Sequence, residues 1–320
     1  MSQWKSINDL KISLSNTIIG QAHLVERLLI ALLADGHLLV EGAPGLAKTK
    51  AIKTLSDGVE CSFHRIQFTP DLLPADITGT EIFRPQDGSF TFQPGPIFHN
   101  LILADEINRA PAKVQSALLE AMGERQVSIG AETHALDELF LVMATQNPIE
   151  QEGTYPLPEA QLDRFLMHVT IDYPDAESEH QILRLVRQEA GGHATHELPP
   201  KISQTTLFEA RKQVLAIHMS DEIEAYIVQL IMATRKPEGY DAEFASLFEY
   251  GASPRGTIAL DRCSRSLAWL NGRDYVTPTD VQMIAHDALR HRFGISFEAE
   301  AKGLTPQHVI DELLNRVPVP

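Results

Sequence analysis

The first half of the chain alternates short apolar runs with stretches of helical periodicity. The apolar runs predict β-strands at residues 37–40, 63–68, 101–104, 139–144 and 166–171. The stretches between them predict helices at residues 21–34, 48–56 and 111–123. Near-continuous apolar strands separated by helices are typical of a parallel sheet that is covered on both faces. The pattern therefore predicts an α/β core with a parallel five-stranded sheet between helices.

Two insertions interrupt this alternation. Within residues 82–98, Asp87-Gly88 stands ahead of the alternating run at residues 89–92, and this is a strong signal for a β-hairpin turn. Residues 126–136 have Gly130 at their centre and form a weaker hairpin candidate. We therefore expect two hairpin inserts in the core.

After residue 174 the strand pattern stops and helical signals take over. Ser253-Pro254, Thr277-Pro278 and Thr305-Pro306 each place a capping hydroxyl before a proline at the first helical position. Gly191-Gly192 is typical of a flexible linker between segments. These signals predict an α/β core over residues 1–175 and a small all-helical domain over residues 176–320.

The segment after the first strand has the P-loop pattern G-x-x-x-x-G-K-[ST], with Ala47 in place of the second glycine. Such a loop points backbone N–H groups at an anion and opens a helix whose dipole favours negative charge. Lys48 would contact the β- and γ-phosphates of a nucleotide, and the Thr49 hydroxyl would bind Mg²⁺. We expect a negative φ at Ala47, since that conformation accommodates a Cβ atom. The candidate nucleotide-binding residues are Gly42, Ala43, Pro44, Gly45, Leu46, Ala47, Lys48 and Thr49.

An apolar strand at residues 101–104 ends in two adjacent carboxylates, Asp105 and Glu106. Packing does not explain adjacent acids at the end of a buried strand. In a P-loop ATPase the first acid holds Mg²⁺ through water and the second polarises the attacking water. We assign these roles to Asp105 and Glu106.

Three further polar residues are candidates for the same chemistry. Asn147 follows the strand at residues 139–144, where open α/β sheets bind ligands. Arg164 precedes the last predicted strand. Arg255 lies in the first turn of the helix capped by Ser253, where the helix dipole disfavours a positive charge unless an anion such as phosphate compensates.

Composition narrows the class of protein. The chain has 320 residues and a net charge of −16, which disfavours a general nucleic-acid-binding protein. Its two cysteines are far apart and are interpreted as buried apolar residues. The first ten residues lack the apolar core of a signal peptide, and no apolar run is long enough to span a bilayer, so we expect a cytoplasmic protein. The 13 histidines suggest no metal cluster, and the run Arg290-His291-Arg292 suits a helix C-terminus.

Together these motifs resemble the MoxR family of AAA+ ATPases. The likeness runs from about residue 18 to about residue 292, and its two most specific stretches are 67–74 and 155–165. An alanine at position 47 is usual in that family. The other segments that carry the resemblance are residues 42–49, 76–79, 103–110, 144–148 and 251–255.

The resemblance implies more than the spacing does. It makes Asn147 the sensor 1 residue, Arg255 the sensor 2 residue, and Arg164 an arginine finger that reaches the γ-phosphate of a neighbouring subunit. It places Ile19 beside the adenine. It also implies homo-oligomeric rings, commonly hexamers, that use ATP and Mg²⁺ for chaperone-like remodelling, maturation or metal insertion of client complexes. Partners with a von Willebrand factor A domain are a recurring theme.

Four other interpretations stay open at this point. A small-molecule kinase would use the same P-loop but would need neither Glu106 nor an arginine finger. A nucleic-acid-directed motor would bind duplexes in a salt-dependent way. A switch could use ATP to assemble, with incidental turnover. A chelatase-like motor would belong to the same class of ATPase.

Overall fold

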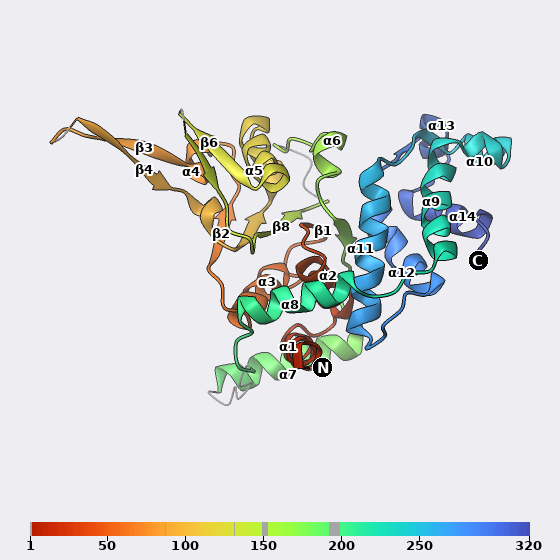
Figure 1. The fold of residues 1–320 in the computed structure, drawn as a ribbon, viewed down its shortest axis with the longest axis horizontal. Coiled ribbons are helices and arrows are strands. Elements are labelled where there is room, and N and C mark those ends of the chain that lie inside the picture. The colour runs from red at the N-terminus through yellow and green to blue at the C-terminus, as the bar shows by residue number, and fades with distance from the viewer. Residues whose placement is uncertain (1, 87, 131, 149–152, 192–198) are drawn as a thin grey trace. The chain divides into compact units, whose positions relative to one another are not determined.

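The protein is described by a computed structural model that covers residues 2–86, 88–130, 132–148, 153–191 and 199–320. Its contacts divide the chain into two compact units (Figure 1). The sheet unit comprises residues 2–157 and 169–207, and the helical unit comprises residues 158–168 and 208–320. Each unit is described separately, and the predicted domain boundary near residue 175 stays a prediction.

The sheet unit contains the predicted five-stranded parallel sheet, in the order β2-β5-β8-β1-β9. The central strands β5 and β8 are almost wholly buried because their apolar runs face helices on both sides. The carboxyl ends of the parallel strands meet at one edge of the sheet. The strands are β1 (Leu38–Glu41), β2 (Phe63–Gln67), β5 (Leu101–Asp105), β8 (Leu141–Gln146) and β9 (Met167–Thr170, whose first two residues group with the helical unit).

Three helices of this unit, α2, α3 and α5, match the predicted ranges, whereas α1 and α4 were not predicted. Residues 22–33 form the apolar helix α2, and α3 begins at Lys48, immediately after the P-loop motif. The helices are α1 (Ser2–Thr17), α2 (Ala22–Leu33), α3 (Lys48–Asp57), α4 (Pro74–Thr78), α5 (Ala112–Glu124) and α7 (Ala176–Ala190), with 3₁₀ turns at Pro96–Phe98 and Ile107–Arg109.

Both predicted inserts are antiparallel hairpins, and they lie side by side (Figure 1). The first pairs β3 (Gly79–Arg84) with β4 (Ser89–Pro94), and the second pairs β6 (Gln126–Ile129) with β7 (Glu132–Ala135). Stacking of Phe92 on His134, with ring centroids 4.0 Å apart, joins the two hairpins. Gly88 has the positive φ of 70° that its turn requires, while Asp87 lies outside the described residues.

The helical unit is built from capped helices, as its Ser/Thr-Pro signals predict. Thr277 and Asp280 form the expected capping box, and the Ser253 hydroxyl accepts a hydrogen bond from the Arg255 N–H. The helices are α6 (Glu159–Leu162), α8 (Gln204–Leu215, which begins in the sheet unit), α9 (Asp221–Arg235), α10 (Ala242–Ala245), α11 (Pro254–Leu270), α12 (Pro278–Leu289), α13 (Phe297–Ala301) and α14 (Pro306–Arg316), with a 3₁₀ turn at Pro237–Gly239.

Two features of this unit differ from the sequence-based expectation. A short antiparallel pair, β10 (Phe248–Tyr250) with β11 (Gly294–Ile295), adds strands where only helices were expected. These strands are too short to show the alternation of apolar and polar residues by which a strand is predicted. The basic run follows the C-terminus of α12 as expected, but the helix dipole does not suffice to explain it, because His291 and Arg292 are buried. An internal acid, Asp163, pairs with Arg292 and makes that burial possible.

Candidate functional site

The P-loop begins where two backbone segments approach each other closely. The Gly42 N–H donates to the Gln146 carbonyl of β8 at 3.3 Å. A Cβ atom at position 42 would lie 2.5 Å from Ile171 Cγ1 and 2.8 Å from the Ile171 carbonyl oxygen. Only glycine fits there, so the first residue of the motif fixes how the loop leaves the sheet.

The loop contains two left-handed residues, Gly45 with φ 86° and Ala47 with φ 58°. The expectation of a negative φ at Ala47 was wrong. A left-handed residue followed by a right-handed one turns successive N–H groups toward a common point, which creates an anion-binding nest. Ala47 directly precedes Lys48, the first residue of α3, so this geometry aims the N-terminus of the helix at the same point. The strain at Ala47 is of the kind that concentrates at functional sites.

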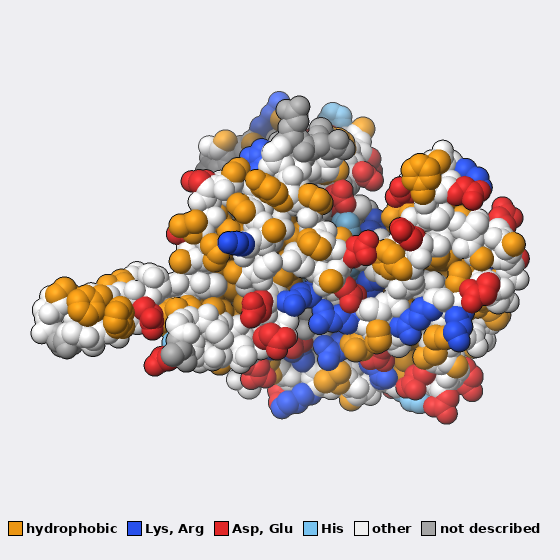
Figure 2. Space-filling view, turned by 90° about the horizontal axis from the view of Figure 1, so that it is seen from above, with side chains coloured by type: hydrophobic (Ala, Val, Ile, Leu, Met, Phe, Trp, Pro, Cys, Tyr) orange, Lys and Arg blue, Asp and Glu red, His pale blue; other side chains and the backbone are white. Residues whose placement is uncertain are grey.

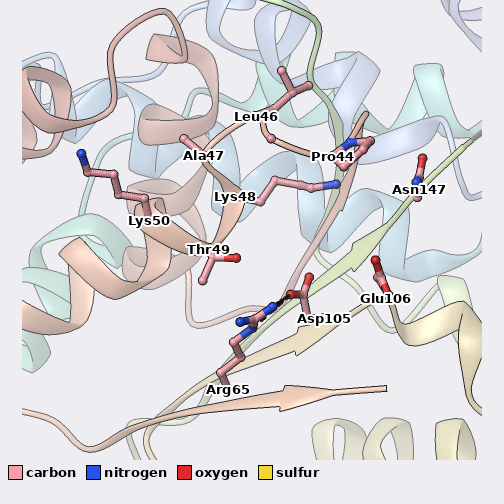
Figure 3. Close-up of a pocket in the computed structure, with 11 residues that line it drawn as sticks. Pro44, Leu46, Ala47, Lys48, Thr49, Lys50, Arg65, Asp105, Glu106 and Asn147 are labelled. Atoms are coloured by element: carbon pink, nitrogen blue, oxygen red, sulfur yellow. Dashed lines mark hydrogen bonds and ion pairs between the residues drawn. The ribbon is translucent and has the colours of Figure 1, made fainter. Parts of the chain in front are cut away.

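The loop borders a cavity of about 410 Å³. Side chains from the P-loop, β5 and β8 converge on it, among them Lys48, Asp105 and Asn147 (Figure 3). Long stretches of chain separate these residues, and the parallel sheet brings them to one edge. The lining residues are Pro44, Gly45, Leu46, Ala47, Lys48, Thr49, Lys50, Arg65, Asp105, Glu106 and Asn147.

The predicted adenine contact, Ile19, does not line this cavity. It is half-buried in the turn between α1 and α2. A Cβ atom on the neighbouring Gly20 would lie 2.7 Å from Pro174 Cβ, so the turn packs against the segment that follows β9. The role of Ile19 stays a prediction.

Lys48 extends across the loop toward the cavity. Its ammonium group donates to the Gly42 carbonyl at 2.7 Å and to the Gln146 carbonyl at 3.5 Å. Burial lowers the pKa of Lys48, and the carboxylates of Asp105, Glu106 and Glu41 oppose that shift. A bound phosphate can replace the two carbonyl partners of the Lys48 ammonium group.

Asp105 is held through both of its oxygens. The Thr145 hydroxyl donates to Oδ1 at 2.6 Å, and the Arg65 guanidinium donates to Oδ2 through Nη2 at 2.6 Å and Nε at 3.1 Å. Thr145 also accepts the Glu106 N–H at 2.9 Å, so one hydroxyl positions both acids. The Asp105 carboxylate and the Thr49 hydroxyl are hard oxygen donors of the kind that Mg²⁺ prefers, so these residues fit the ion that the family implies.

Glu106 has a left-handed backbone, with φ 57°, directly after the strand. Its carboxylate accepts a hydrogen bond from Gln67 Nε2 at 2.9 Å and pairs with Arg109 Nη1 at 3.2 Å. The backbone turn and these two partners hold the carboxylate at the cavity wall, where it can orient a water molecule.

Arg164 and Arg255 both belong to the helical unit. Arg164 is half-buried directly after Asp163, and Arg255 is exposed in the first turn of α11. The Ser253 hydroxyl, which caps α11, donates to Asp163 Oδ2 at 2.8 Å. Asp163 therefore ties the Arg164 segment to the start of the helix that carries Arg255.

A buried arginine reinforces that tie. Arg292 lies with Nε 3.1 Å from Asp163 Oδ1, and its guanidinium donates to the carbonyls of Phe165 at 2.6 Å and Leu166 at 3.2 Å. We call Arg292 and Asp163 the buried arginine clamp. Burial lowers the pKa of Arg292, and the Asp163 carboxylate opposes that shift.

Sequence reasoning missed four residues that shape the site: Arg65, Gln67, Thr145 and Arg109. Thr145 stood in the quoted motif at residues 144–148, and a hydroxyl at the end of an apolar strand was an available signal. Arg65 and Gln67 alternate with buried Ile66 on β2, which places them on one face of the strand. Only the strand order shows that this face lies beside Asp105.

Comparison with known proteins agrees with this geometry. The description "ATPase family associated with various cellular activities (AAA)" matches residues 37–167, and "AAA lid domain" matches residues 242–313. The chain is 47% identical to "Chaperone MoxR1" of Mycobacterium tuberculosis over 308 residues, covering 95% of this chain and 79% of that protein. It is 33% identical to "Protein MoxR" of Paracoccus denitrificans, covering 100% of this chain and 98% of that protein.

The chain belongs to the MoxR family of AAA+ ATPases. The crystal structure of a candidate ATPase from Cytophaga hutchinsonii is similar over 100% of this chain and 96% of its own, with a TM-score of 0.89 and 45% identity. The predicted fold class and family are therefore confirmed. Among the described residues, no helix of this MoxR-family chain is both long and apolar enough to cross a membrane.

Proposed function

We propose that this MoxR-family chain hydrolyses Mg²⁺-ATP in a homo-oligomeric ring, hexameric by analogy with the family, and uses the cycle to remodel or mature client protein complexes. One observation carries the proposal: Lys48, Thr49, Asp105, Glu106 and Asn147 converge on one cavity beside an N–H nest. The family resemblance suggests metal insertion as one form of this role and a protein with a von Willebrand factor A domain as a partner.

The proposed chemistry assigns each side chain one task. The nest and Lys48 would bind the phosphates, while Thr49 and Asp105 would hold Mg²⁺, which would neutralise charge on the phosphates. Glu106 orients the attacking water, and Asn147 lies where it can contact that water or the γ-phosphate. Thr145 supports both acids through its single hydroxyl. Because transfer to water needs a positioned nucleophile, the placement of Glu106 favours an ATPase over a small-molecule kinase.

We further propose that Arg164 of one subunit approaches ATP held by the neighbouring subunit, and that Arg255 also contacts phosphate. An arginine that stabilises the charge of the transition state raises kcat for phosphoryl transfer by roughly 10³–10⁵-fold in well-studied NTPases. The hydrogen bond from Ser253 to Asp163 supports this proposal because it connects the segments that carry both arginines, and Arg292 pairs with the same aspartate.

The deciding experiment measures Mg²⁺-dependent ATPase activity per subunit as protein concentration rises, for the wild type, Glu106→Gln and Arg164→Ala. We expect specific activity to increase with concentration. We expect Glu106→Gln to lower kcat by about 100-fold or more while nucleotide still binds. Activity that is independent of concentration and of Arg164 would show that each chain works alone, and would reopen the kinase and switch interpretations.

The β3–β4 hairpin is the proposed contact with clients. Ile82, Phe83 and Phe90 are exposed on it, and Figure 2 shows hydrophobic side chains gathered on the protruding end at the left of the view. Phe90 is 65% exposed, so Phe90→Ala should leave stability nearly unchanged. We expect the variant to keep basal ATPase activity and lose client remodelling. Intact remodelling in a folded variant would exclude this contact.

A further inference from the structure

Arg65 is a charged residue of the cavity that the reaction scheme above does not use. It lies on the edge strand β2, and its side chain reaches the neighbouring strand β5 to contact Asp105 (Figure 3). Two of its N–H groups, Nη2 and Nε, converge on the same oxygen, Asp105 Oδ2. The guanidinium therefore occupies the one carboxylate oxygen that Thr145 does not hold.

That oxygen is also the one that a metal ion would need. The Thr145 hydroxyl holds Oδ1 at 2.6 Å, which leaves Oδ2 as the oxygen that Thr145 does not occupy. A cation on Oδ2 and the Arg65 guanidinium compete for that oxygen, since both are positively charged and each is drawn to the same lone pairs.

We propose that Arg65 is a resident counter-ion for Asp105, which Mg²⁺-nucleotide displaces on binding. The proposal rests on the Mg²⁺-ATP site proposed above. The Asp105 side chain is only 12% exposed, so an unpaired carboxylate there would be costly and would repel phosphate groups. Arg65 neutralises it in the absence of the metal.

The exchange is easy because Arg65 is itself accessible. Its side chain is 49% exposed, and an ion pair with one exposed partner is held weakly. A second partner is already in place, since Arg65 Nη2 donates to Gln67 Oε1 at 3.0 Å. The displaced guanidinium can stay on Gln67 without crossing open solvent.

The counter-ion proposal predicts a result that the loss of one positive charge from the cavity would not by itself produce. Without Mg²⁺, removal of Arg65 exposes the Asp105 charge to the phosphates, so nucleotide binding should weaken. With Mg²⁺ present, the metal in the variant no longer competes with the Arg65 guanidinium for Asp105, so nucleotide binding should strengthen. The two affinities should therefore move in opposite directions, each by about fivefold.

The test titrates the full chain with fluorescent N-methylanthraniloyl-ADP, in EDTA and in saturating Mg²⁺, for the wild type and Arg65→Gln. The matched control is Arg109→Gln, which removes the same charge from Glu106 rather than from Asp105. We expect opposite shifts only for Arg65→Gln. A lowered Mg²⁺ concentration for half-maximal binding should accompany them.

Equal shifts in the same direction, or no shift, would overturn the counter-ion proposal. Lys48→Ala separates this outcome from failure of the site itself, because it should abolish binding under both conditions. If Lys48→Ala binds like the wild type and Mg²⁺ does not alter wild-type binding, then the proposed nucleotide site is wrong as well.

Discussion

Two arginine–aspartate pairs, Arg65–Asp105 in the sheet unit and Arg292–Asp163 in the helical unit, differ in how far the arginine is exposed to solvent. In the sheet unit, Arg65 lies 2.6 Å from Asp105 with a side chain that is 49% exposed. In the helical unit, Arg292 lies 3.1 Å from Asp163 with a side chain that is 2% exposed. A pair with an exposed member exchanges partners at little cost, whereas a buried pair is costly to break. The first pair suits a site that must admit a cation, and the second suits a scaffold that holds segments together.

The largest expected effect would come from breaking the buried pair. Arg292→Met leaves the Asp163 carboxylate without its buried cation and removes one donor from the Phe165 carbonyl, so we expect a loss of about 3–5 kcal/mol in the free energy of unfolding. Arg65→Gln should change the free energy of unfolding by no more than about 1 kcal/mol.

The measurement uses the chain's two tryptophans, Trp4 in the sheet unit and Trp269 in the helical unit. In a Trp4→Phe background, Trp269 fluorescence during denaturant unfolding reports on the helical unit. The loss in the free energy of unfolding is measured for each variant with the tryptophan of its own unit. Equal losses for Arg292→Met and Arg65→Gln would show that the buried pair is no costlier to break than the exposed one.

A smaller effect should come from the strained P-loop backbone. Ala47 has φ 58°, a conformation that a β-branched residue adopts only with severe strain. We expect Ala47→Val to lower the free energy of unfolding by about 2 kcal/mol and to weaken binding of N-methylanthraniloyl-ADP. Ala47→Gly is the control and should stay within about 1 kcal/mol of the wild type. If Val and Gly behaved alike, residue 47 would not be left-handed.

The smallest effect should appear as a pH dependence beside the buried clamp. Burial and the neighbouring Arg292 hold the pKa of His291 well below its ordinary value of 6.5. The unfolded chain therefore binds more protons than the folded chain below that value, and stability falls as pH decreases. The slope should approach about 1.4 kcal/mol per pH unit.

Denaturant unfolding, followed through Trp269 from about pH 7.5 to about pH 5.5, checks this expectation. His291→Gln should remove most of the slope that His291 contributes, while burial of His286 leaves a residual dependence because it also lowers the pKa of that residue. An unchanged slope in His291→Gln would show that the ring is accessible to protons in the folded state.

The sequence by itself determined the local elements and the main chemistry of the site. Apolar runs, capping hydroxyls and the glycine pattern of the P-loop depend on neighbours within a few residues, so periodicity and turn chemistry identify them. The strand preceding Asp105 and Glu106, the helix that starts at Lys48 and the two hairpins could all be predicted this way. Family likeness then supplied the candidate roles of Arg164, Arg255 and Ile19.

Only the tertiary structure decided which distant side chains meet. Arg65 lies beside Asp105 because β2 is the neighbour of β5, and strand order is not encoded in the periodicity of either strand. Arg292 is buried because Asp163, more than a hundred residues earlier, supplies the opposite charge. The positive φ of Ala47 reflects the convergence of loop N–H groups on one point. Burial of charge and backbone strain depend on partners that folding assembles, and for that reason local pattern alone could not reveal them.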